Sequence, residues 1–229
     1  MSRVLIKDRE IVVPGEELIV GMDYLPAGAA FREKDKIIAN SIGLANVGNR
    51  LIRVIPLSGK YVPKAGDTII GQIADIGLSG WRVDIGWSFE ANISMKDGST
   101  DFIERGSDLT QYYNYGDYVV AKILKVVGPK IIDLTMKGPG LRKLNDGKII
   151  KVNSSKVPRI IGKAGSMIHL IKEKTGCNIM VGQNGKVWIS GKEPGNVILT
   201  IKAIRKIEEL SHIQGLTDKI KEFLEGEKK

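Results

Sequence analysis

Short apolar runs that alternate with polar residues fill the middle of the chain and predict β-strands. They are separated by turn residues and cover residues 68–74, 81–86, 91–94, 118–127 and 130–136. The run Trp81–Ile85 reads Trp-Arg-Val-Asp-Ile, so its apolar side chains fall on one face of a strand and its charged side chains on the other. Five such strands predict a small barrel whose interior holds the apolar side chains.

The last third of the chain mixes strand-like and helix-like periods. Residues 147–152 predict a strand, and two apolar helical turns then flank the loop Gly162–Gly165. Two further apolar runs, 177–181 and 187–189, are joined by Gly-Gln-Asn-Gly, in which Asn-Gly is a hairpin signal. From Pro194 onward, apolar residues recur every three or four positions and predict a long amphipathic helix: Val197, Ile198, Ile201, Ile204, Ile207 and Leu210. The expected order of elements is βααββα.

The first sixty residues form a third unit that carries no chemical motif. Strand-like runs at 11–16, 37–39 and 51–57 are joined by glycine-rich connections such as Gly43–Gly48, which predicts a compact all-β domain. The expected fold is therefore multidomain and mainly β, with a C-terminal α+β part. The expected domains are, in chain order, a β domain at 1–60, a five-stranded barrel at 61–144, and an α+β domain with a C-terminal helix at 145–229.

The loop Gly162–Gly165 is the feature that points to a ligand. Because glycine lacks a Cβ atom, a nucleic-acid backbone can approach both ends of the loop, and Lys163 places a positive charge between them. The simpler alternative is a helix–loop–helix turn that uses glycine for local reasons alone. Apolar residues on both sides are expected to face a core: Ile160, Ile161, Ile168 and Ile171. The candidate RNA contacts here are Arg159, Gly162, Lys163, Ala164, Gly165 and Lys172.

The positive charge of the chain is concentrated in its C-terminal part. The formal net charge is +9, and residues 148–229 hold 16 Lys and Arg against 8 Asp and Glu, whereas residues 1–147 hold 19 against 18. A phosphate-attracting patch is expected around the loop, from Lys156, Arg159, Lys163, Lys172 and Lys174 with only Glu173 opposing them. The last lysines alternate with acidic residues and are expected to form a solvated face: Lys219, Lys221, Lys228 and Lys229.

The βααββα order and the motif Ile-Ile-Gly-Lys-x-Gly-x-x-Ile, which begins at Ile160, resemble the KH domain over about residues 147–210. In KH domains this loop grips a few nucleotides of single-stranded RNA or DNA. The resemblance therefore implies a single-stranded nucleic acid as the ligand of the C-terminal domain.

The barrel segment has a resemblance of its own. Short motifs follow one another in the order seen in the RNA-binding OB-fold module named after the largest small-subunit ribosomal protein: Gly71-x-Ile73, Val83–Gly86, Gly116-Asp117-x-Val119 and Leu134–Met136. That module usually carries aromatic residues where this chain has Ser79 and Arg82. Because stacking platforms are missing there, we expect backbone contacts by Arg82 and Lys122, outward on neighbouring strands, with ordinary surface charge as the alternative.

Other aromatic residues of the barrel segment could also stack on bases. Aromatic residues that precede a strand more often pack onto the barrel rim, however, so rim packing is the expectation. The residues concerned are Tyr112, Tyr113, Tyr115, Trp87 and Phe89.

The order of the three units narrows the family. A β domain with Val-Pro-Gly-Glu at 13–16, then Tyr61-Val62-Pro63-Lys64-x-Gly66-Asp67, then the OB-fold and the KH domain resemble the KH-containing RNA-binding cap subunit of the archaeal exosome. The resemblance implies a non-catalytic, cytoplasmic subunit that binds single-stranded RNA. It further implies three caps on a hexameric ring of phosphate-dependent exonucleases, with the first domain docked to the ring and RNA 3′ ends guided inward. One departure is Gly28–Phe31, where the family often shows Gly-Thr-Tyr.

The sequence offers no catalytic or cofactor site. His169 and His212 are expected as surface or packing residues, so neither serves a Ser-His-Asp or Cys-His arrangement. The single cysteine, Cys177, excludes an internal disulfide and a zinc ribbon and is expected in the core. No apolar run approaches 18 residues, so a soluble chain without a membrane partner is expected. Two alternatives remain open: a free-standing RNA-binding regulator of translation or transcription, and a chain that is itself a nuclease.

Overall fold

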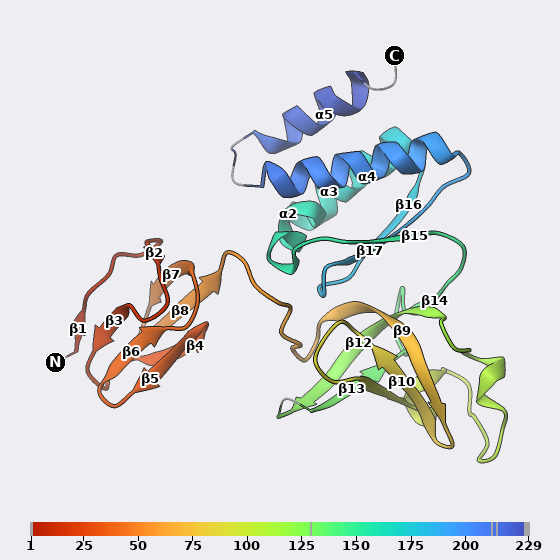
Figure 1. Ribbon diagram of the computed structural model, residues 1–229, viewed down its shortest axis with the longest axis horizontal. Coiled ribbons are helices and arrows are strands. Elements are labelled where there is room, and N and C mark those ends of the chain that lie inside the picture. Colours follow the sequence, from red (N-terminus) through yellow and green to blue (C-terminus); the bar gives the residue numbers. More distant parts are fainter. Residues whose placement is uncertain (1, 129, 212, 214, 227–229) are drawn as a thin grey trace. The chain divides into compact units, whose positions relative to one another are not determined.

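The computed structural model describes residues 2–128, 130–211, 213 and 215–226. Three residues with a predicted role lie outside the described residues: His212, Lys228 and Lys229. The chain divides into two compact units, Met1–Lys60 and Tyr61–Lys229, and the second unit contains both the barrel and the KH-like domain (Figure 1).

The first unit consists of two four-stranded sheets, with strand orders β1-β3-β6-β5 and β2-β7-β8-β4. Both sheets contribute to one core, in which Val12, Leu18, Ile37 and Val54 are fully buried. The strands are β1 (Arg3–Val4), β2 (Ile11–Val12), β3 (Glu17–Val20), β4 (Leu25–Gly28), β5 (Ala30–Glu33), β6 (Lys36–Ala39), β7 (Gly43–Gly48) and β8 (Leu51–Pro56).

The expectation that Gly43–Gly48 is a connection was wrong, because this segment is strand β7 and pairs antiparallel with β8. A Cβ atom on Gly43 would lie 2.4 Å from Cγ1 of Val54 and 2.8 Å from the carbonyl oxygen of Ile55. Glycine is therefore used here because β8 approaches closely, and not because the chain turns.

The barrel matches the prediction strand by strand. Its sheet has the order β13-β11-β10-β9-β12-β14, and an additional β13–β12 pairing closes five of these strands into a barrel. The strands are β9 (Thr68–Gly77), β10 (Gly80–Asp84), β11 (Ala91–Ser94), β12 (Tyr118–Val127), β13 (Ile131–Thr135) and β14 (Arg142–Leu144). The short strand β14, which extends the sheet beside β12, was not predicted.

The alternation along β10 is confirmed, because Trp81, Val83 and Ile85 are buried whereas Arg82 and Asp84 are exposed. The Trp81 ring meets Tyr113 edge-on at a centroid distance of 5.1 Å and donates its indole N–H to the Tyr113 carbonyl oxygen (3.1 Å). Tyr112 also packs against this core, so rim packing is confirmed for these two tyrosines.

The third domain has a three-stranded sheet of order β15-β17-β16, with helices α2, α3 and α4 packed together around one core (Figure 1). Its element order confirms the KH-like prediction. The elements are β15 (Lys148–Lys151), α2 (Val157–Ile161), α3 (Ser166–Thr175), β16 (Asn178–Val181), β17 (Lys186–Ser190), α4 (Pro194–Glu209) and α5 (Leu216–Gly226).

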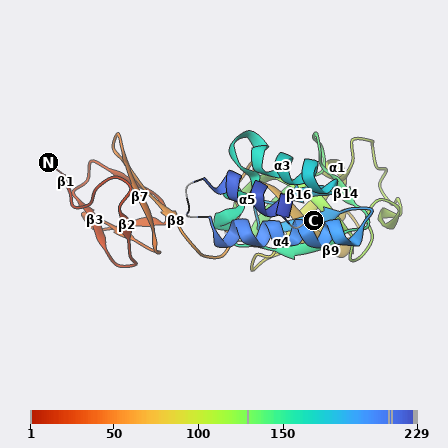
Figure 2. The same cartoon turned by 90° about the horizontal axis from the view of Figure 1, so that it is seen from above.

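The buried face of α4 differs from the predicted one at its first turns. Ile198 is 56% exposed, whereas Leu199 and Ala203 are buried together with the predicted Ile204 and Ile207. Helix α5 lies over α3 and α4 (Figure 2) and buries three apolar side chains in the same core: Leu216, Ile220 and Leu224. Lys219 and Lys221 are exposed, as expected, but they lie on the outer face of a helix whose other face is packed in the core.

The hairpin β16–β17 joins this domain to the barrel. Its predicted Asn-Gly turn is confirmed, and the Asn184 side-chain amide donates to the carbonyl oxygens of Ile70 and Ile85 (both 2.8 Å) and accepts from the Ile70 N–H (3.2 Å). The ammonium of Lys186 is buried beside Asp84 and donates to its carbonyl oxygen (3.1 Å). Burial lowers the pKa of Lys186, and Asp84 offsets part of this effect.

Candidate nucleic-acid interface

The Gly162–Gly165 loop has a backbone that only glycine-rich sequence forms easily. Helix α2 ends at Ile161 and is capped by Gly162 with φ +76°, and Ala164 and Gly165 follow with φ +52° and +82°. A Cβ atom on Gly162 would lie 2.7 Å from the Met167 nitrogen, whereas one on Gly165 would meet open space. The loop therefore needs Gly162 for packing and Gly165 for its backbone conformation.

The loop is exposed, whereas the apolar residues that flank it are buried. Val157, Ile160 and Ile171 are fully buried beneath it, which confirms the predicted core face, while Lys163 and Ala164 are exposed. Ile161 and Ile168 are half-buried and pack against the same core. Helix α3 starts directly after the loop, so the positive end of its dipole faces the same region.

The cations near the loop are not equivalent. Arg159 and Lys163 are exposed on α2 and the loop, and neither is in an ion pair within the part of the chain that the structure describes. Lys174, in contrast, forms an ion pair with Glu225 of α5 (2.8 Å). Lys172 lies in the last turn of α3, about 9 Å along the helix axis from its start, and so is away from the loop that it was expected to surround.

On the barrel, the structure separates the two predicted cations. Arg82 and Lys122 are both exposed, but they do not lie on neighbouring strands, because β9 runs between β10 and β12. Arg82 is opposite Asp75 and Lys122 is opposite Thr68, seven positions apart on β9. Arg82 also pairs with the Asp75 carboxylate (3.8 Å), which offsets its charge, whereas a backbone contact by either cation stays a prediction.

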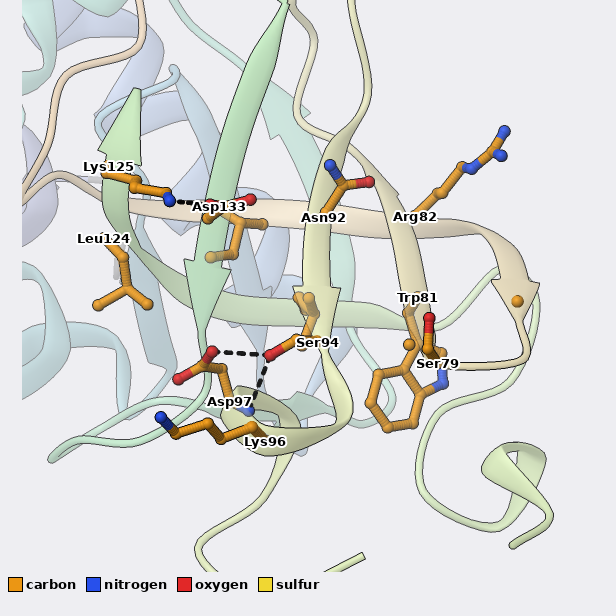
Figure 3. A pocket seen from close by; sticks show the side chains of 14 residues that line it. Ser79, Trp81, Arg82, Asn92, Ser94, Lys96, Asp97, Leu124, Lys125 and Asp133 are labelled. Carbon is orange, nitrogen blue, oxygen red and sulfur yellow. Dashed lines mark hydrogen bonds and ion pairs between the residues drawn. The ribbon is translucent and has the colours of Figure 1, made fainter. Parts of the chain in front are cut away.

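A polar groove crosses the barrel sheet instead (Figure 3). Arg82, Asn92, Asp133 and Lys125 lie in register on β10, β11, β13 and β12, above a hollow of about 660 Å³. Sequence reasoning missed Asn92 and Lys125, although the period-2 alternation of their strands places both outward. An ion pair joins Lys125 to Asp133 (3.3 Å), so the groove offers hydrogen-bonding groups with little net positive charge.

Three aromatic residues of the barrel differ in exposure. Tyr115 is exposed and donates its hydroxyl to Asp75 (3.1 Å), and Phe89 is partly exposed beneath the Lys130 ammonium. Trp87 packs against the barrel core. Of these, Tyr115 and Phe89 are the ones that nucleic acid can reach.

The described residues can also be searched for a metal site, a reactive side chain and a membrane-spanning helix. Within the described residues, no three His, Cys, Asp or Glu side chains gather closely enough to hold a metal ion. Cys177 is buried and unpaired, as expected of a core residue, and His169 is exposed on α3. No helix in the described ranges has both the length and the apolar character that crossing a membrane requires.

Comparison with known proteins gives the family. Residues 147–195 match the family model of the KH domain. The exosome complex component Rrp4 of Pyrococcus furiosus is 44% identical over 227 residues, which cover 98% of this chain and 86% of the relative. The corresponding component of Thermoplasma acidophilum is 38% identical, with 96% and 93% coverage.

A solved structure agrees with these relatives. The crystal structure of a protein assigned as an exosome complex RNA-binding protein is 34% identical, with a TM-score of 0.66. The match covers 74% of this chain and 98% of that one. Sequence similarity over nearly the full length, the KH match and the shared fold lead to one conclusion: the chain belongs to the Rrp4 family of exosome complex components.

Proposed function

We propose that this protein is a non-catalytic, RNA-binding subunit of an exosome, and that it binds single-stranded RNA through the loop Gly162–Gly165. The observation that carries the proposal is the exposed loop itself, in a chain of the Rrp4 family: Lys163 lies just before α3 and makes no ion pair with any residue that the structure describes. Phosphates can approach the glycine backbone closely there and meet a lysine charge together with the positive end of the α3 dipole.

The rest of the proposed role follows from the division of the chain. The unit at 1–60 docks onto the exonuclease ring, and the barrel at 61–144 and KH domain at 145–229 hold the RNA. Three copies on the ring, in the cytoplasm, would then raise the local RNA concentration and direct 3′ ends to the phosphate-dependent exonuclease. Arg159 and Lys163 act at the loop, and Lys172 contacts a more distant nucleotide.

A free-standing RNA-binding regulator would use the same loop without a ring. Membership of the Rrp4 family favours the exosome subunit, because the relatives of this chain are exosome complex components. Isolation of the native protein from cell extract distinguishes the two roles, since a ring assembly is several-fold heavier than the 25.1 kDa chain.

Charge reversal in the loop tests RNA binding directly. Lys163→Asp with Ala164→Asp should weaken binding of a labelled single-stranded RNA by at least tenfold at low salt, because phosphates are repelled where they were attracted. Fluorescence anisotropy gives the dissociation constant, and thermal melting should be unchanged because both side chains are exposed.

The matched control compares two single variants: Lys163→Asp in the loop and Lys192→Asp away from it. Lys192 is exposed in the connection between β17 and α4, at the other end of the KH domain from the loop (Figure 1). The same change of charge at this position should have a much smaller effect on affinity. Equal effects of the two single variants, or an unchanged affinity in the double variant, would contradict RNA binding by the loop.

A further inference from the structure

Phe102 is the most exposed aromatic residue of the second unit, with 88% of its surface accessible. It lies between α1 (Met95–Gly98) and the short 3-10 helix Leu109–Gln111, in a segment that contacts the rest of the barrel domain on both sides of Phe102. The next residue, Ile103, is buried in the barrel core, and the Tyr113 hydroxyl donates to the Gly98 carbonyl oxygen (2.7 Å). Because Ile103 points inward, Phe102 is held outward on an anchored stretch of chain.

The surroundings of Phe102 are positively charged. It lines a hollow of about 500 Å³ together with Lys96, Arg105 and Lys137, with Asp101 as the one acidic residue of the lining. Throughout the described ranges, none of these three cations takes part in an ion pair. An exposed aromatic ring beside three unpaired cations matches a base flanked by phosphates.

This hollow continues the polar groove of the barrel. Both are lined by Ser79, Ser94 and Lys96, three residues that Figure 3 labels in the groove, so the two hollows adjoin there. In the groove, Arg82 and Lys125 are paired with carboxylates, whereas the cations around Phe102 are free of such pairing among the described residues. The positive potential and the aromatic surface of this part of the barrel therefore coincide at Phe102.

We propose that Phe102 is a stacking platform for one base of single-stranded RNA, and that Lys96, Arg105 and Lys137 hold the adjacent phosphates. The proposal rests on the proposed function, RNA binding, and adds a second contact on the barrel. It also accounts for the absence of aromatic residues at Ser79 and Arg82, since the stacking surface is supplied by the connection after β11. Because every base has a π-face, this contact selects single-stranded over paired RNA with little sequence preference.

The test compares Phe102→Ala, Phe102→Trp and the control Phe31→Ala in the full chain. Phe31 is a partly exposed phenylalanine of β5 in the first unit, so the control makes the same change elsewhere. Binding of a short labelled oligoadenylate should weaken about five- to tenfold with Phe102→Ala, the lower part of the range for one stacked base. Phe102→Trp should keep the affinity, and its indole fluorescence should fall on RNA binding, while Phe31→Ala should change nothing.

Lys137→Gln provides a second measurement. It should reduce the log–log dependence of affinity on salt by about 0.7, the value for one phosphate contact on a single strand. An unchanged slope would remove Lys137 from the contact.

Two outcomes separate this inference from the proposed function. If Lys163→Asp with Ala164→Asp weakens binding but Phe102→Ala does not, the stacking platform is overturned while RNA binding stands. If neither variant alters affinity, RNA binding itself is overturned. Because Phe102 is exposed, its variants should melt like the parent protein, and a lowered melting temperature would show a structural role instead.

Discussion

At the scale of single residues, one side-chain amide makes several of the hydrogen bonds between the KH domain and the barrel, beside a buried apolar cluster that also joins them. The side chain of Asn184 makes three hydrogen bonds to backbone atoms of β9 and the end of β10, and a Cβ atom on the neighbouring Gly182 would lie 2.7 Å from the Ile70 nitrogen. The hairpin thus docks against the barrel without space for a larger residue at Gly182. The same turn that joins β16 to β17 thus also links the domain that carries the Gly162–Gly165 loop to the barrel.

Asn184→Ala should destabilise the second unit by about 2–4 kcal/mol, because it leaves backbone groups of Ile70 and Ile85 without their partners. Urea unfolding followed by tryptophan fluorescence measures the change, since Trp81 and Trp188 are both buried in this unit. The control is Gln183→Ala, because Gln183 reaches Thr68 through its backbone N–H, which alanine retains. Equal losses for the two variants would contradict the role given to the Asn184 amide.

At the scale of elements, the barrel strands and the loop Gly162–Gly165 could be predicted because their signals are local. Strand alternation along β10 depends only on which side chains point inward, and positive φ at Gly162 and Gly165 depends on the two glycines themselves. Strand adjacency is not local. Arg82 and Lys122 were expected side by side, but β9 lies between their strands, a fact that alternation does not encode.

Other features of the structure were not predicted from the sequence, for related reasons. Gly43–Gly48 was expected to be a connection because glycine usually marks turns, yet here it allows two strands to approach closely. Helix α5 was described only by its charges, because lysines and acids alternate along it and mask the apolar stripe of Leu216, Ile220 and Leu224. The exposure of Phe102 was not predicted, because the sequence alone does not distinguish an exposed aromatic residue from a buried one.

The packing of α5 gives a prediction at this scale. Ile220→Ala should lower the free energy of unfolding by about 2–4 kcal/mol, since the side chain is fully buried between α5 and the helices beneath it. Lys219→Ala, on the exposed face of the same helix, should change it by less than about 0.5 kcal/mol. Chemical denaturation measures both, and similar small effects for the two variants would show that α5 is not part of the core.

At the scale of the whole molecule, the surfaces that we propose to bind RNA all belong to the second unit. The basic surplus lies in residues 148–229, and the exposed cations of the loop and of the Phe102 hollow are carried by the second unit. The described residues hold no cluster that could bind a catalytic metal. We propose that this chain captures RNA and that the exonuclease ring degrades it, which its membership of the Rrp4 family favours.

The most direct test is degradation of a long single-stranded RNA by the exonuclease ring with and without this protein, in magnesium and inorganic phosphate. We expect the pure protein alone to leave the RNA intact. Adding it to the ring should speed degradation most at limiting RNA and low salt, and the Lys163→Asp, Ala164→Asp variant should assist less. Shortening of RNA by the pure protein, in proportion to its amount through successive purification steps, would contradict the non-catalytic role.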